Sequence, residues 1–113
     1  MVPPVLNGRQ RRHLRALAHH QKAVVQVGHG GATPGVVQAL DEALLTHELV
    51  KVRVLGETET SLEEISAELG RATGSALAQT IGRTLLFYRP HPKKPRIVLP
   101  GGAAGDDDED AES

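Results

Sequence analysis

Apolar residues recur along this chain with two different periods, and each period predicts a different secondary structure. In three stretches they return every three or four positions, which predicts amphipathic helices. Four shorter runs are β-branched or alternate with polar residues, which predicts strands. The expected helices run from Gly8 to about His19, from Pro34 through an apolar face at Val36–Leu44, and from Leu62 through Ala72. The expected strands are Ala23–Val27, Leu49–Leu55, Leu77–Ile81 and Thr84–Arg89.

Polar residues and glycines mark where these helices begin and end. Asn7 with Gln10, and Ser61 with Glu64, have the spacing of capping boxes, in which each side chain bonds a free backbone N–H group of the other residue. Thr33 followed by proline fits an N-cap with Pro at the first helical position. The apolar stripes are Leu14, Leu17 and Ala18 in the first helix, and Leu62, Ile65, Leu69 and Ala72 in the third, which we expect Gly74 to end.

The order of elements, α-β-α-β-α-β-β, limits the possible folds. Strand–helix–strand units make their strands parallel, with helices covering a face of the sheet. The last two strands, joined through Gly82 and Arg83, form a hairpin that adds an antiparallel strand. In the second strand, Val50, Val52 and Val54 share one face, while Lys51 and Arg53 lie on the other. We therefore expect an α/β fold, a two-layer domain with a four-stranded mixed sheet, with Leu85 and Phe87 in its core.

Charge divides the 113-residue chain unevenly. Residues 101–113 hold six acids and no basic residue, so we expect them to form a disordered tail. Residues 7–100 then form one folded domain after an N-terminal extension at 1–6. Without the tail, 13 Lys and Arg stand against 8 Asp and Glu, a net charge of +5. Residues 1–40 contain no acid and five cations: Arg9, Arg11, Arg12, Arg15 and Lys22.

This acid-free segment is consistent with two interpretations. Arg11, Arg12 and Arg15 lie within little more than one helical turn, and a polyanion is their natural counter-charge. A solvated basic helix face is the alternative. The tail likewise either competes with a polyanion for the basic surface or only keeps a basic protein soluble.

A glycine-rich segment, "VGHGGATPG" at residues 27–35, separates the first expected strand from the second helix. Gly28, His29, Gly30 and Gly31 form a G-x-x-G pattern, which KH domains use to hold a nucleic-acid backbone. The three glycines can adopt positive φ without strain, so that successive N–H groups can converge near the helix N-terminus, which favours a phosphate. A tight turn without a ligand is the alternative.

Several classes of protein do not fit the sequence. It has no cysteine, no apolar run approaching about 18 residues and no signal peptide, so we expect a cytoplasmic protein without membrane contact. The six histidines include no i, i+4 pair on a helix, so we expect no metal site. The G-x-S-x-G, Walker A and G-x-G-x-x-G motifs are absent. We therefore expect no catalytic residue, no cofactor and no enzymatic activity.

The low aromatic content limits how a nucleic acid could be bound. With one Phe, one Tyr and no Trp, stacking of bases cannot dominate, and recognition of the backbone and its shape remains. An adaptor that binds an acidic protein through its basic helix is the non-enzymatic alternative.

The segment "LNGRQRRHLRALAHHQKAVVQVGHGGATPGVVQALDEALLTHELVKVRVLG", followed by "IGRTLLFYRP", resembles the YhbY family, the stand-alone bacterial form of the CRM (chloroplast RNA splicing and ribosome maturation) domain. The resemblance spans roughly residues 6–99. It implies a fold similar to the C-terminal domain of translation initiation factor 3. It also implies binding of rRNA in the precursor of the large ribosomal subunit and a part in assembly of that subunit. We expect the protein to be a monomer.

The resemblance also implies which residues contact RNA. It places Gly28, His29, Gly30 and Gly31 in the contacting loop, although Lys or Arg is usual in the family at the position of His29. The basic surface beside that loop would consist of Arg9, Arg11, Arg12 and Lys22, and the charge pattern adds Arg15. Arg83 is a further candidate, or a hairpin residue that bonds local carbonyls. Lys51 and Arg53 extend the basic face or only keep the strand soluble.

Overall fold

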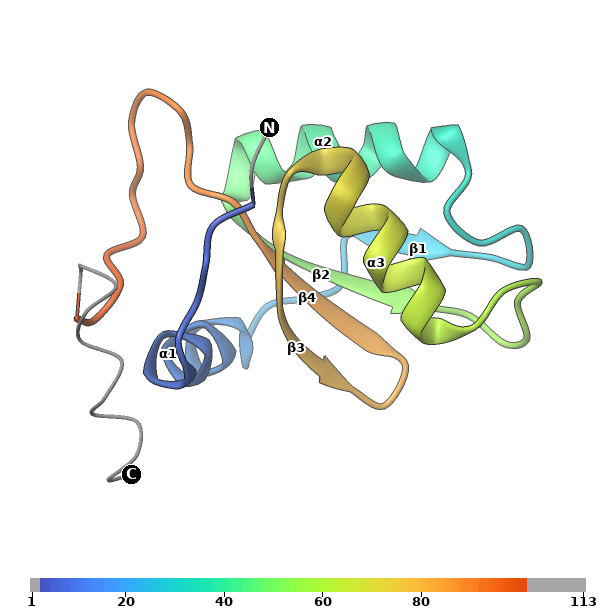
Figure 1. The fold of residues 1–113 in the computed structure, drawn as a ribbon, viewed down its shortest axis with the longest axis horizontal. Coiled ribbons are helices and arrows are strands. Elements are labelled where there is room, and N and C mark those ends of the chain that lie inside the picture. Colours follow the sequence, from blue (N-terminus) through green and yellow to red (C-terminus); the bar gives the residue numbers. More distant parts are fainter. Residues whose placement is uncertain (1–2, 102–113) are drawn as a thin grey trace.

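Residues 3–101 are described in the computed structural model, and they contain three helices and four strands (Figure 1). The helices are α1 (Gly8–Ala18), α2 (Pro34–His47) and α3 (Leu62–Thr73). The strands are β1 (Val25–Val27), β2 (Leu49–Val54), β3 (Ala76–Ile81) and β4 (Thr84–Tyr88). The α/β class and the expected order of elements are confirmed. Apart from Gly101, the acidic tail expected at 101–113 lies outside the described residues, as do the first two residues of the expected N-terminal extension.

The helices begin where the capping signals indicate. The Asn7 side chain accepts a hydrogen bond from the Gln10 N–H (2.8 Å), and Gln10 Oε1 accepts one from the Asn7 N–H (3.1 Å). Ser61 and Glu64 form the same reciprocal pair at the start of α3. Thr33 Oγ1 accepts from the Val36 N–H, with Pro34 at the first helical position. Each such cap typically stabilises a helix by about 1 kcal/mol.

The sheet is mixed, and its strands lie in the order β1-β2-β4-β3. β1 pairs with β2 in parallel, whereas β4 is antiparallel to both β2 and β3. The hairpin therefore places β4 inside the sheet, between two strands that run in the same direction and do not touch. β1 is shorter than expected, because its pairing with β2 begins at Val25 and not at Ala23.

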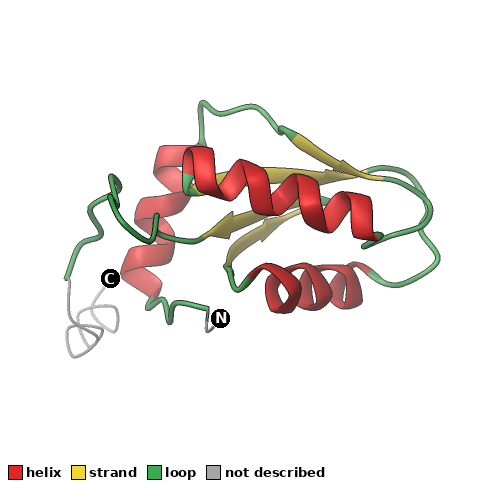
Figure 2. Cartoon of the chain, turned by 90° about the horizontal axis from the view of Figure 1, so that it is seen from above, coloured by secondary structure: helices red, strands yellow, loops and turns green. Residues whose placement is uncertain are grey.

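Helices cover both faces of the sheet, so the domain has three layers and not the expected two (Figure 2). α2 and α3 pack on one face, where Val50, Val52 and Phe87 are completely buried. α1 packs on the other face, over Leu49, Leu86 and Tyr88. The expectation was wrong because the charged residues of β2 suggested a solvated second face. At the start of β2 that face is apolar, and Leu49 is only 1% exposed.

Two positions on the expected helix stripes face solvent. Leu17 is 42% exposed, and the buried line of α1 is Gln10, Leu14 and Ala18 at strict i, i+4 spacing. In α3, Ala72 is exposed and Thr73 is buried. The Thr73 hydroxyl donates to the Leu69 carbonyl at 2.7 Å.

None of the helices in residues 3–101 is long and apolar enough to span a bilayer.

A buried carboxylate at the end of α2 fixes the segment that follows β4. Glu48 is fully buried and has a positive φ of 64°, a conformation that costs a non-glycine residue about 1–2 kcal/mol. Its carboxylate accepts hydrogen bonds from the backbone N–H groups of His91 (2.6 Å), Arg96 (3.0 Å) and Ile97 (2.9 Å). Burial raises the pKa of this carboxyl, but the three N–H donors and the nearby Arg96 charge outweigh burial and lower the pKa below its usual value.

The segment held by Glu48 completes the core beneath α1. Ile97 and Leu99 pack against the cluster that contains Leu14, and the Gln10 side-chain amide donates to the Pro100 carbonyl at 3.2 Å. Nearby, the buried Arg89 guanidinium binds the Asp41 carboxylate at 2.7 Å. Residues 90–100 therefore belong to the folded domain although they form neither helix nor strand.

We predict that Glu48→Gln lowers the free energy of unfolding by about 1–3 kcal/mol, because an amide cannot accept all three N–H groups and leaves buried donors unsatisfied. Chemical denaturation at pH 7 measures this loss. The control is Glu42→Gln, an exposed residue of the same helix, which should change stability by less than about 0.5 kcal/mol. An equal effect of both substitutions would contradict the role assigned to Glu48.

The lowered pKa also fixes the sign of the pH dependence. Stability contributed by Glu48 is present above the unfolded-state pKa of a Glu carboxyl and is lost as pH falls through the folded-state pKa. The stability of the Glu48→Gln variant should therefore fall less steeply on acidification than that of the wild-type protein.

Candidate nucleic-acid interface

Charges of opposite sign lie on different sides of the sheet. Every acidic residue within residues 3–101 lies on α2, at its C-cap, on α3 or in the loop that precedes α3: Asp41, Glu42, Glu48, Glu57, Glu59, Glu63, Glu64 and Glu68. The other side consists of α1, its connection to β1, and the β2 side chains that lie on the α1 face of the sheet. Its charged residues, histidine apart, are all cations: Arg9, Arg11, Arg12, Arg15, Lys22, Lys51 and Arg53. An anionic partner would therefore approach the α1 side of the domain.

The α1 arginines and the glycine loop do not lie side by side. Arg9, Arg11, Arg12 and Arg15 are all exposed, as the sequence predicts. Figures 1 and 2 both place α1 at one end of the molecule and the loop between β1 and α2 at the other end. The basic surface expected beside the loop is therefore separate from it, and sequence spacing could not show this because β1 carries the chain away from α1.

The glycine loop is built around one position that favours glycine. Gly31 is buried, with φ of 72°, and a Cβ there would come within 3.2 Å of Thr60 Oγ1. Gly28 and Gly30 do not adopt the positive φ that the sequence permits, and both are exposed. The Gly31 N–H bonds the Gly28 carbonyl at 3.0 Å, which closes the turn. Gly31 thus shapes the loop, and Gly28, with open space around it, is the position that another molecule could approach closely.

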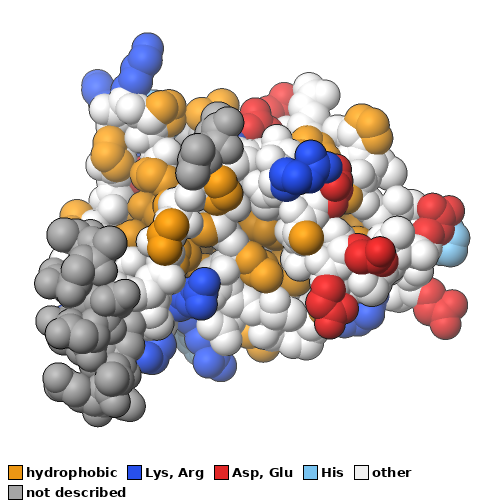
Figure 3. Space-filling view, viewed as in Figure 1, with side chains coloured by type: hydrophobic (Ala, Val, Ile, Leu, Met, Phe, Trp, Pro, Cys, Tyr) orange, Lys and Arg blue, Asp and Glu red, His pale blue; other side chains and the backbone are white. Residues whose placement is uncertain are grey.

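Carboxylates border the tip of this loop. His29 Nδ1 lies 3.4 Å from the Glu57 carbonyl, and His29 Nε2 lies 3.8 Å from a Glu59 carboxylate oxygen. The Glu59 N–H donates to the His29 carbonyl at 2.9 Å, which ties the two loops together. Figure 3 shows carboxylates gathered with a histidine at this end of the molecule. The loop therefore offers close backbone approach and little positive charge.

Half of the α1 side of the sheet is not covered by α1. Gln26, Arg53, Thr84 and Ile81 are directly opposite one another across all four strands, so their side chains share one face. Three of the four are exposed and Thr84 is partly exposed. Lys51, two residues before Arg53, lies on the same face. We name these five residues, Gln26, Lys51, Arg53, Ile81 and Thr84, the bare sheet surface.

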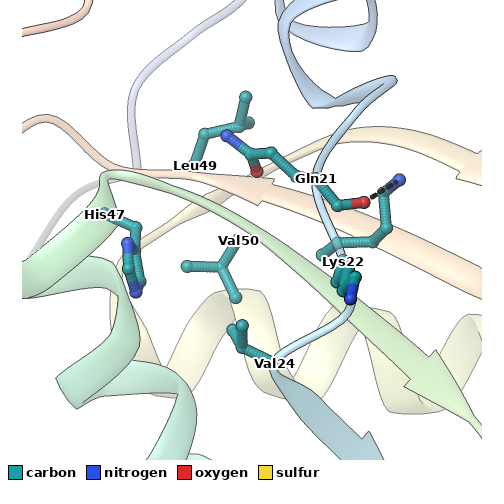
Figure 4. A pocket seen from close by; sticks show the side chains of 7 residues that line it. Gln21, Lys22, Val24, His47, Leu49 and Val50 are labelled. Atoms are coloured by element: carbon teal, nitrogen blue, oxygen red, sulfur yellow. Dashed lines mark hydrogen bonds between the residues drawn. The ribbon is translucent and has the colours of Figure 1, made fainter.

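Two hollows border the bare sheet surface. One, of about 250 Å³, lies between α1 and the strands and is lined by Arg15, His19 and Lys51 over an apolar floor that includes Leu86. The other, of about 230 Å³, lies near the start of β1, with Lys22 and His47 around Val24 (Figure 4). Lys51 lines both, and its ammonium donates to the Gln21 carbonyl at 2.9 Å, which holds the side chain in place.

The remaining predicted residues fall near this surface. Lys22 is exposed in the connection between α1 and β1. Arg83 is exposed at the β3–β4 turn, and its Nε donates to the Val54 carbonyl at 3.3 Å. This contact agrees with the alternative in which Arg83 is a hairpin residue that bonds nearby carbonyls.

In residues 3–101, no group of three or more His, Cys, Asp or Glu side chains is arranged to hold a metal ion.

From the sequence, Lys51 and Arg53 either extend the basic face or only keep the strand soluble. The signal was present, because charged residues alternate with buried valines along β2. What the sequence lacked was the strand order. β2 pairs on both sides, so its charges cannot serve to protect a sheet edge.

The chain is similar to proteins of one family. The model of the CRS1/YhbY (CRM) domain matches residues 6–89. A Bacillus subtilis protein named "Probable RNA-binding protein YqeI" is 38% identical over 96 residues, which cover 85% of this chain and all of that protein. An RNA-binding protein of Haemophilus influenzae is 40% identical over 95 residues, covering 84% of this chain and 95% of the relative.

A solved structure is similar to the whole fold. The solution structure of a candidate RNA-binding protein from Staphylococcus aureus superimposes with a TM-score of 0.73. The two sequences are 36% identical, and the match covers 85% of this chain and 100% of that one.

The exposed Gly28 and the buried Gly31 should respond differently to substitution. Gly31→Ala should lower the free energy of unfolding by about 1–2 kcal/mol, because alanine disfavours positive φ and its Cβ would crowd Thr60. Gly28→Ala should leave stability within about 0.5 kcal/mol of the wild-type value, because nothing lies within 4 Å of the added atom. Denaturation of both variants makes the comparison, and equal losses would show that the loop is not built around Gly31.

Proposed function

This chain belongs to the CRS1/YhbY (CRM) domain family, and on that premise we propose that it binds RNA through its α1 side and its glycine loop. We propose further that the RNA is rRNA in the precursor of the large ribosomal subunit, and that the protein acts in the cytoplasm in assembly of that subunit, without catalysis. The observation that carries the proposal is the separation of charge, which leaves the α1 side of residues 3–101 with cations and no acid.

Relatives that match over most of their length support RNA as the partner. Both the Bacillus and the Haemophilus proteins carry RNA-binding in their names, and each is covered almost completely by this chain. The CRM family match spans all three helices and all four strands of residues 3–101. It therefore includes both surfaces that the proposal uses.

The two surfaces would make different contributions. The α1 arginines are exposed and would contact phosphates, whose release of counterions makes binding depend on salt. The loop would contribute close approach at Gly28, in the segment that leads to the N-terminus of α2, while the Glu59 carboxylate beside His29 limits the charge that the loop can contribute. Affinity should therefore come mainly from the α1 side.

We expect the double variant Arg11→Ala, Arg12→Ala to weaken binding to RNA of any sequence and to flatten the dependence of log K on log salt by roughly one unit per lost phosphate contact. Titration of labelled RNA at several salt concentrations measures both effects. The control is Lys93→Ala, Lys94→Ala, which removes the same charge from exposed residues of the segment after β4. An equal loss in both variants would show a general effect of net charge.

Crosslinking in cells, followed by sequencing of the attached RNA, tests the identity of the partner. We expect enrichment of large-subunit rRNA precursor over mature rRNA and messenger RNA. The matched measurement uses the Arg11→Ala, Arg12→Ala variant, which should lose that enrichment at equal protein level. Recovery of proteins without RNA would instead support the adaptor function.

A further inference from the structure

The bare sheet surface is placed where a nucleic acid could continue from α1 toward the glycine loop. We propose that this surface binds the phosphate backbone and sugars of double-helical RNA. The proposal rests on the proposed function, because it names the kind of RNA and a contact surface that the family resemblance did not assign.

The charge at the centre of this surface has no structural role in the fold. Arg53 is exposed on a strand that pairs with β1 on one side and β4 on the other, so it neither fills a core nor shields an edge. Lys51 lies two residues earlier on the same face, roughly 7 Å away along the strand. No acidic residue of the described chain lies on this face. Two neighbouring cations without counter-charges suit a phosphate backbone.

The neighbours of these cations suit the sugars of RNA. Gln26 and Thr84 flank Arg53 directly across the strands, and both carry uncharged groups that donate and accept hydrogen bonds. The wide, shallow minor groove of A-form RNA displays 2′-hydroxyl groups between its phosphates. From β1 to β3 the surface spans three strand spacings, roughly 14 Å, which is broad enough to meet a groove and not only a single strand.

The same surface is poorly suited to single strands. Proteins that bind single-stranded RNA without sequence preference stack its bases on exposed aromatic side chains. Phe87 and Tyr88 are the only aromatic residues of the whole chain apart from histidine, and they are 0% and 4% exposed. Affinity must then come from phosphates and sugars held in fixed positions, which a double helix provides.

Lys51 is also held in position for such a contact. Its ammonium donates to the Gln21 carbonyl, and Arg15 and Lys51 both line the hollow between α1 and the strands. Cations from α1 and from β2 thus border a single depression. An RNA backbone that lay along it would meet both.

The test compares Arg53→Gln with Arg71→Gln, each of which removes one positive charge from an exposed arginine. Arg71 lies on α3, on the acidic side of the domain, where it pairs with Glu68. Binding of each full-length variant is titrated against an RNA hairpin with a long stem and against an unstructured single strand of equal length, over a range of salt concentrations.

We expect the wild-type protein to bind the hairpin about tenfold or more tightly than the single strand. Arg53→Gln should weaken hairpin binding about five- to tenfold and reduce the salt slope by about one unit, whereas Arg71→Gln should change neither. A preference for the single strand, or equal effects of the two substitutions, overturns this inference while leaving the proposed function intact. Failure of the wild-type protein to bind either RNA overturns the proposed function itself, and this inference with it.

Discussion

The buried Glu48 carboxylate connects the parts of the domain that the sequence separates most widely. Glu48 lies between the end of α2 and the start of β2 and has a positive φ. Its oxygens then bind three N–H groups of the segment after β4, which in turn lays Ile97 and Leu99 under α1. Because α1 carries most of the basic residues of the candidate interface, a carboxylate on the acidic side of the sheet helps to position cations on the basic side.

This arrangement also explains how one small domain keeps two signs of charge apart. The sheet separates α1 from α2 and α3, and the buried charges, Glu48 and Arg89, are neutralised within the fold by backbone N–H groups and by Asp41. The exposed acids and the exposed α1-side cations therefore lie on opposite sides of the sheet. Such a molecule has a field that orients it as it approaches a polyanion, before any contact forms.

Local signals predicted much of the fold, because they act over a few residues. The two capping boxes and the valine alternation of β2 fixed element positions to within one or two residues. The third layer was not predictable, since Leu49, Leu86 and Tyr88 form one cluster only after β4 has entered the sheet. Glu48 was missed for the same reason: its partners lie 43 to 49 residues further along the chain. In the glycine loop, the sequence permitted positive φ at three residues, and Gly31 alone adopts it, at a place where a Cβ would crowd Thr60.

The position of β4 has a consequence for how the protein can be made. β2 and β3 run in the same direction but never pair, so the sheet stays in two pieces until the strand between them has been synthesised. Until residue 88 has left the ribosomal exit tunnel, a nascent chain leaves the facing edges of both strands unpaired. It also lacks Leu85 and Phe87 in one core cluster and Leu86 and Tyr88 in the other. Folding should therefore be completed late and in one cooperative step, with little native structure in shorter translation intermediates.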